Sequence, residues 1–206
     1  GSGALADFSS LGIKVDSAVS YYIKKGVHAV AFSGDKLLGG PQSGIICGKK
    51  TTIKKMHQNA FYRALRCDKL KFSILENILR TYSSSKEISP ENLTVYLLKR
   101  KRIDLERLGK SILMNIKKSY IQKYNIELVE SEVEAGSGSL PTQKIPSMAI
   151  TFSSKSLKPS QLSEMFRKGS IPIIGYIHGN KFRIDLKAIP DEFATVCSRI
   201  LNEVLQ

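Results

Sequence analysis

The chain has 206 residues, of which 42% are hydrophobic, so it can build the core of one large or two small domains and is not a disordered chain. Its 32 Lys and Arg residues outnumber 18 Asp and Glu residues, and the formal net charge of +14 favours a polyanionic partner, either nucleic acid or an acidic membrane face. No apolar run is long enough to cross a bilayer, and no signal-peptide pattern is present. The three cysteines are odd in number and far apart, which predicts free thiols in a reducing, cytoplasmic compartment.

The first hundred residues predict two short buried strands set among helices. In chain order we expect a helix over 17–25, strands over 27–32 and 43–48, a helix over 51–58, and another helix from about residue 68. The last of these helices carries apolar residues at helical spacing, namely Leu75, Ile78, Leu79 and Tyr82.

The second half predicts a long helix and then a mixture of strands and helices. We expect a helix starting at Ser89-Pro90-Glu91, a long helix over 104–120, strands over 126–133 and 148–153, a helix over 160–168, a hairpin over 171–186 with its turn at Gly179-Asn180, and a helix over 191–205. Residues 136–146 read as a flexible segment. We therefore expect three parts: residues 1–103 at the end of an α/β domain, a connecting helix over 104–124, and a small α+β domain over 125–206.

The loop between the two first strands holds one lysine, Lys36, at its tip. It follows Ser33 and Asp35 and precedes a rigid Gly-Gly-Pro turn. An isolated loop lysine is usually solvated. A lysine held between two buried strands is instead typical of an amine that has a fixed position in a functional site. Burial near other cations lowers the pKa of an amine, so such a lysine can form a Schiff base with pyridoxal phosphate. The Ser33 hydroxyl and the loop amides can receive a phosphate.

Two further basic segments are candidate anion sites. Arg63 and Arg66 lie three residues apart on an expected helical turn, where their guanidinium groups either bind one phosphate-like anion or form a solvated basic face. The run over 99–102 is either a solvated link between helices or a contact to a nucleic-acid backbone. The three histidines are scattered without ligand spacing, so we expect no metal site.

The string SGDKLLGGPQ around the lysine resembles the lysine loop of the bacterial selenocysteine synthases, the L-seryl-tRNA(Sec) selenium transferases, and a matching RALR string follows at the family's interval. The resemblance implies that Lys36 is the catalytic residue that holds pyridoxal 5'-phosphate, with Ser33 and Asp35 also at the cofactor. It implies that Arg63 and Arg66 hold the phosphate of the selenium donor.

The same resemblance implies a fold and a reaction. The fold is the aspartate-aminotransferase-like (fold type I) pyridoxal-phosphate α/β fold, of which this chain would hold the end of the large domain and the small C-terminal α+β domain. The reaction is the conversion of seryl-tRNA(Sec) to selenocysteinyl-tRNA(Sec) with selenophosphate, by β-elimination followed by selenium addition. We expect a cytoplasmic transferase, assembled as a ring of dimers without a membrane partner. This chain alone should be an inactive C-terminal part of it.

One residue departs from the family, and two other functions remain open. Where the family usually has an arginine after the glycine of a VIGR-like strand, this chain has Tyr176, which puts a charge contact from that strand in doubt. The alternatives are a related pyridoxal-phosphate lyase acting on a small amino acid or sugar acid, and a non-enzymatic basic RNA-binding module.

Overall fold

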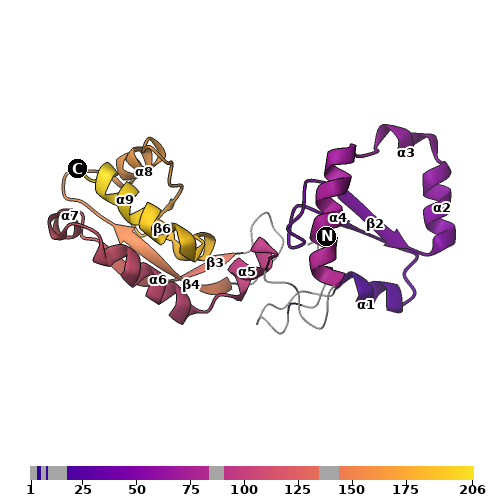
Figure 1. The fold of residues 1–206 in the computed structure, drawn as a ribbon, viewed down its shortest axis with the longest axis horizontal. Coiled ribbons are helices and arrows are strands. Elements are labelled where there is room, and N and C mark those ends of the chain that lie inside the picture. Colours follow the sequence, from indigo (N-terminus) through magenta and orange to yellow (C-terminus); the bar gives the residue numbers. More distant parts are fainter. Residues whose placement is uncertain (1–3, 6–7, 9–17, 84–90, 135–143) are drawn as a thin grey trace. The chain divides into compact units, whose positions relative to one another are not determined.

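The computed structural model describes residues 4–5, 8, 18–83, 91–134 and 144–206, and the chain is a mixed α/β protein of two compact units (Figure 1). One unit comprises Gly1–Lys99 and Glu134–Gln143, and the other comprises Arg100–Val133 and Lys144–Gln206. The domain boundaries at 103 and 125 stay predictions. Most of the expected flexible segment 136–146 lies outside the described residues, but its last three residues begin a strand.

The first unit contains an antiparallel strand pair and five helices among its described residues. They are α1 (Val19–Lys24), β1 (Ala29–Ser33), β2 (Gly44–Gly48), α2 (Lys50–Gln58), α3 (Ala60–Ala64), α4 (Lys69–Ser83) and α5 (Leu93–Lys99). Both predicted strands are confirmed, and β1 pairs with β2 from Ala29 opposite Gly48 to Ser33 opposite Gly44. The short helix α3 lies where the sequence predicted a turn.

The core of this unit forms between the strand pair and α4. Val19, Phe32 and Leu38 are buried there. The apolar face predicted for α4 is confirmed, because the residues packed against this core include Leu75, Ile78, Leu79 and Tyr82. The strand pair therefore gains its stability from a helix that follows it in sequence, since a two-stranded hairpin alone is marginal in water.

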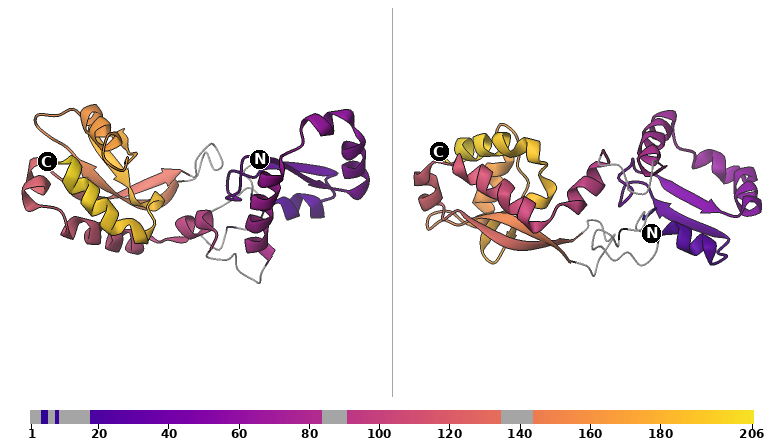
Figure 2. Two further views of the ribbon diagram at one scale, coloured as in Figure 1. Left: turned by 45° about the horizontal axis from the view of Figure 1, so that its top comes forward. Right: turned by 60° about the horizontal axis from the view of Figure 1, so that its bottom comes forward.

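The second unit is a four-stranded sheet packed against helices. Its elements are α6 (Arg102–Met114), α7 (Lys118–Lys123), β3 (Glu127–Glu134), β4 (Lys144–Phe152), α8 (Pro159–Arg167), β5 (Tyr176–His178), β6 (Lys181–Asp185), two 3₁₀ turns (Leu186–Ala188 and Asp191–Phe193) and α9 (Ala194–Val204). The strand order is β3-β4-β6-β5, and the right view of Figure 2 shows α6 and α9 together on one face of the sheet. The hairpin turn is confirmed at Gly179 and Asn180, whose φ angles of 57° and 56° suit a tight β-hairpin turn.

The long helix predicted over 104–120 is wrong, because the chain forms α6 and α7 with a break at Asn115–Lys117. Asn202 of α9 stabilises the break through its side-chain amide. Its nitrogen donates to the Asn115 carbonyl oxygen at 2.7 Å, and its oxygen accepts from the Lys117 backbone N–H at 3.1 Å. An amide from a distant helix thus satisfies the backbone groups that the interruption leaves without helical partners.

Segment 104–124, predicted as a connector, contributes to the core of the second unit. Leu105 and Ile112 of α6 are fully buried in that core. Three aromatic rings form the centre of the cluster, with centroid separations of 5.0 to 5.9 Å between Phe152, Phe166 and Phe182. Aromatic pairs at these distances add to the stability that their burial supplies.

Candidate functional site

The loop that carries Lys36 is closed by its own backbone hydrogen bonds. The Gly34 N–H donates to the Ser43 carbonyl oxygen at 2.9 Å, and the Gly40 N–H donates to the Gly34 carbonyl oxygen at 2.8 Å. The Gly39 N–H donates to the carbonyl oxygen of Lys36 itself at 2.9 Å. Gly39 has φ 77°, a conformation that a residue with a Cβ rarely adopts, so glycine at this position allows the turn.

Two side chains from later in the chain hold the same loop in place. Leu38 is fully buried, and its carbonyl oxygen accepts hydrogen bonds from the Tyr82 hydroxyl at 3.1 Å and from the Asn92 side-chain amide at 3.3 Å. Burial of its ring raises the pKa of Tyr82 to about 12, so this phenol remains a donor at neutral pH. The backbone beside Lys36 is therefore fixed by tertiary contacts as well as by the turn.

The predicted cofactor residues lie together at the end of β1. Lys36 and Ser33 are half-buried, whereas Asp35 is exposed. Within the described ranges, the Lys36 amine forms no ion pair or hydrogen bond, and neither does the Ser33 hydroxyl. An amine that forms a covalent bond to an aldehyde must not be held in an ion pair with a carboxylate. The Lys36 amine meets this requirement for a Schiff-base lysine.

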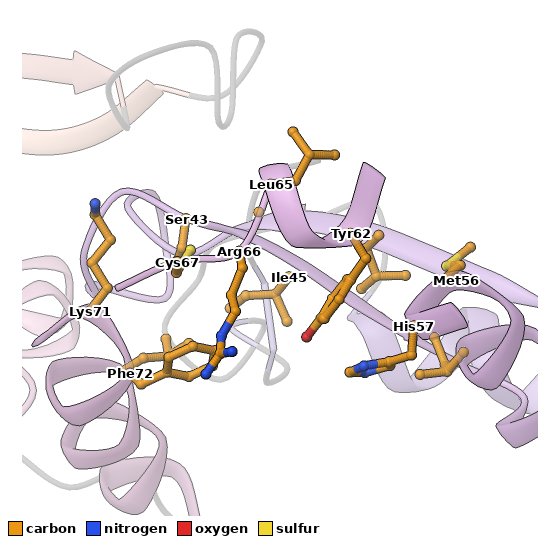
Figure 3. A pocket seen from close by; sticks show the side chains of 14 residues that line it. Ser43, Ile45, Met56, His57, Tyr62, Leu65, Arg66, Cys67, Lys71 and Phe72 are labelled. Carbon is orange, nitrogen blue, oxygen red and sulfur yellow. The ribbon is translucent and has the colours of Figure 1, made fainter. Parts of the chain in front are cut away.

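A hollow of about 280 Å³ opens beside this loop (Figure 3). Ser43, which closes the lysine loop, lies at its wall together with residues of β2, α2, α3 and α4 and of the turn before α4. Most of the lining is apolar, including Ile45, Met56 and Phe72. Lys36 is not among the residues that line this hollow.

The two predicted donor-binding arginines are placed differently. Both are exposed, but Arg63 lies in α3, whereas Arg66 lies beyond Ala64, the last residue of α3, and lines the hollow. The expectation that both lie on one helical turn is therefore wrong. Figure 3 shows the Arg66 side chain extending into the hollow.

An ion pair lies at the rim of the hollow. The Asp68 carboxylate bonds the Lys71 ammonium at 2.9 Å and also accepts the Lys71 backbone N–H at 2.9 Å. These hydrogen bonds lower the pKa of Asp68, the backbone bond having the largest effect, and the bond to Asp68 raises the pKa of Lys71. Because Lys71 is neutralised by its partner, Arg66 is the lining cation left to meet an anion in the hollow.

Two residues that the sequence did not single out as site residues also line the hollow. The rings of His57 and Tyr62 lie 4.2 Å apart between centroids and extend into the same space as Arg66 (Figure 3). Asn59 brings them together, because it ends α2 and its side chain then caps α3 by accepting the Phe61 N–H at 3.0 Å. Asn at this position is a recognisable helix-capping signal in the sequence. The change in direction of the chain between α2 and α3, however, depends on the extended backbone of Asn59, whose ψ angle is 137°.

The described residues do not suggest a metal site or a membrane span. No group of three or more His, Cys, Asp or Glu side chains gathers in this part of the chain. None of the helices that it contains has both the length and the apolar character needed to cross a bilayer.

The chain matches one protein family over most of its length. The model of the family described as "SelA: L-seryl-tRNA selenium transferase" matches residues 1–190. Proteins named L-seryl-tRNA(Sec) selenium transferase are similar as well. The protein of Proteus mirabilis is 36% identical over 199 residues, covering 95% of this chain and 43% of that protein. The protein of Haemophilus influenzae (strain PittEE) is 38% identical over 190 residues, covering 92% of this chain and 41% of that protein.

A solved structure shares the fold. The structure of D-glucosaminate-6-phosphate ammonia-lyase matches 89% of this chain and 45% of its own chain, with a TM-score of 0.58 and 20% identity. That likeness concerns the fold alone. This chain spans less than half the length of the two curated relatives described above.

Proposed function

Because the chain belongs to the SelA family of L-seryl-tRNA selenium transferases, we propose that it forms the lysine-bearing part of a pyridoxal-phosphate-dependent selenocysteine synthase. The whole enzyme would convert seryl-tRNA(Sec) to selenocysteinyl-tRNA(Sec) with selenophosphate as the selenium donor. The observation that supports this most directly is the rigid loop around Lys36, whose amine forms no ion pair or hydrogen bond with the described residues. The ring of dimers remains an expectation drawn from the resemblance.

In this proposal the residues at the end of β1 hold the cofactor. Lys36 would form the covalent bond through its Nζ atom, and the Ser33 hydroxyl and the Asp35 backbone would lie at the phosphate. When bound, pyridoxal phosphate supplies an electrophilic aldehyde carbon and a ring that withdraws electrons from Cα of an attached amino acid. Lys36 Nζ, once released, is the base that would take the proton from Cα of the seryl group.

The hollow beside the loop would receive the selenium donor. Arg66 extends into it, and a guanidinium group binds a phosphate through charge-assisted hydrogen bonds. Arg63 is not among the residues that line the hollow, so we assign it a smaller contribution to binding this anion. The rest of the lining is mostly apolar, so the Arg66 guanidinium group would be the main anchor for the phosphate of the donor.

Borohydride reduction of the full-length protein with pyridoxal phosphate tests the proposal, because reduction makes the lysine bond permanent. Peptide mapping should find the pyridoxyl group on Lys36. The matched control is Lys49→Ala, which removes an exposed lysine just after β2 and should keep the label on Lys36. Lys36→Ala should abolish the label. A pyridoxyl group found on another lysine of the wild-type protein would refute the assignment.

A further inference from the structure

The densest cationic run of the sequence, 99–102, is not an open anion-binding surface. Arg100 is 7% exposed, and its guanidinium group donates to backbone carbonyl oxygens of the turn after β6, including that of Leu186 at 2.7 Å. Arg102 forms an ion pair with Glu130 at 2.8 Å. Two of these four cations therefore serve the fold of the second unit and are not free to bind a polyanion.

A second group of cations gathers at one end of the second unit. We call it the α7 lysine surface, and its members are Lys117, Lys118, Lys123, Lys155 and Lys158. All five are exposed. The two segments that supply them, 115–126 and 153–163, contain no Asp or Glu.

The fold joins these segments, which are nearly thirty residues apart in the chain. The Ser153 backbone N–H donates to the Tyr124 carbonyl oxygen at 2.8 Å. The Asn125 side-chain amide donates to the Ser153 hydroxyl at 3.3 Å, and Asn125 makes the turn out of α7 with φ 41°. These bonds hold the end of α7, which carries Lys123, against the segment that carries Lys155; α7 is labelled in Figure 1.

The charges of this surface are not neutralised by nearby acids. In the described part of the chain none of the five lysines forms an ion pair, and the acids that follow each segment already have partners. Glu127 pairs with Lys181 at 2.6 Å, and Glu164 pairs with Lys168 at 2.6 Å. Five like charges without counter-charges repel one another and favour an incoming polyanion.

The neighbours of these lysines suit a nucleic acid better than a lipid bilayer. Hydroxyl and amide side chains lie between them, and such groups commonly bond to phosphate and sugar oxygens. They are Ser119, Gln122, Asn125, Ser153, Ser154 and Ser156. Neither segment exposes a large apolar side chain that could enter a membrane, although bilayer-binding surfaces normally combine cations with such residues.

We propose that the α7 lysine surface binds the phosphate backbone of RNA, namely the tRNA that the proposed function requires. This inference rests on that function for the identity of the RNA. The binding is electrostatic and independent of base sequence, because lysines on exposed turns and a short helix can contact phosphates without reading base edges. Its role is to hold the body of the tRNA by its phosphates.

The test uses the full-length protein and a tRNA(Sec) transcript, with fluorescence anisotropy measured over a series of salt concentrations. The variant combines Lys118→Gln, Lys123→Gln and Lys155→Gln. The matched control combines Lys110→Gln, Lys144→Gln and Lys168→Gln, which removes the same charge from ion-paired lysines of the same unit. We expect the variant to bind about tenfold or more weakly at low salt, and the slope of log K against log salt to flatten by about two to three. The control should match the wild type.

Three results would overturn the inference. They are equal affinity and slope for the variant and the control, absence of RNA binding by the wild type at low salt, and binding of the surface to anionic phospholipid vesicles in place of RNA. Its failure would leave the pyridoxyl label on Lys36 unchanged. Failure of the proposed function would instead remove that label, whatever the affinity for RNA.

Discussion

Asn92 connects the lysine loop to the start of α5, and its replacement by alanine should loosen the loop. The side chain is 1% exposed. Its amide nitrogen donates to the Leu38 carbonyl oxygen and to the Thr81 hydroxyl, both at 3.3 Å, and its oxygen accepts the Val95 N–H at 3.1 Å as the cap of α5. Asn92→Ala removes all three hydrogen bonds at once.

The expected cost follows from the two roles of the side chain. Loss of the cap costs about 1 kcal/mol. Loss of the two hydrogen bonds that Asn92 donates costs about 1 to 2 kcal/mol more. The Leu38 carbonyl oxygen is buried, and of its two side-chain donors, Tyr82 and Asn92, only the Tyr82 hydroxyl would remain. We therefore expect a local destabilisation of about 2 to 3 kcal/mol.

Hydrogen–deuterium exchange of the loop amides measures this effect where it acts. The Gly34, Gly39 and Gly40 N–H groups, which close the lysine loop, should exchange up to about 30 to 150 times faster in Asn92→Ala. Asn92→Ser is the control, because serine is an equally good cap but is too short to reach Leu38. It should restore the protection of α5 while leaving the loop amides fast. If the loop amides exchanged at the wild-type rate in both variants, the loop would not depend on Asn92 and the reasoning would fail.

Three further predictions test other parts of the fold. The pKa of Tyr82 is raised from 10.0 to about 12, so the unfolded chain loses this proton first and the free energy of unfolding falls as pH rises from 10 towards 12. Tyr82→Phe should remove about 1 kcal/mol of that alkaline loss, after allowance for the partial exposure of the side chain. An unchanged pH profile in urea unfolding would contradict this. Gly48→Ala places a Cβ against the carbonyl oxygen of His28, just before β1, and should cost about 2 kcal/mol or more of unfolding free energy. Gly44→Ala meets no atom within 4 Å and should change that free energy by under about 0.5 kcal/mol. Equal unfolding midpoints for the two variants would refute the predicted contact. Arg100→Met leaves buried carbonyl oxygens of the turn after β6 without their donor and should lower the stability of the second unit by about 3 kcal/mol, which a near-neutral result in thermal unfolding would disprove.

Local patterns in the sequence predicted much of the architecture. The strands around Lys36, the apolar face of α4 and the turn at Gly179 and Asn180 are confirmed, because side-chain periodicity and turn chemistry depend on neighbouring residues. The sequence of the lysine loop also indicated the family, and the match of the family model to residues 1–190 supports that inference. The assignments of Lys36, Ser33, Asp35 and the two arginines to their roles stay predictions.

Only the tertiary structure decided features that depend on residues distant in the chain. Asn202 stabilises the break between α6 and α7 from 85 residues away, where local periodicity favoured a continuous helix. Arg100 is buried by the turn after β6, although its neighbours in sequence suggested a solvated run. The α7 lysine surface forms because Tyr124 and Asn125 bond Ser153. Burial and the gathering of charge are properties of surfaces in space, so they become visible only when the packing of distant segments is known.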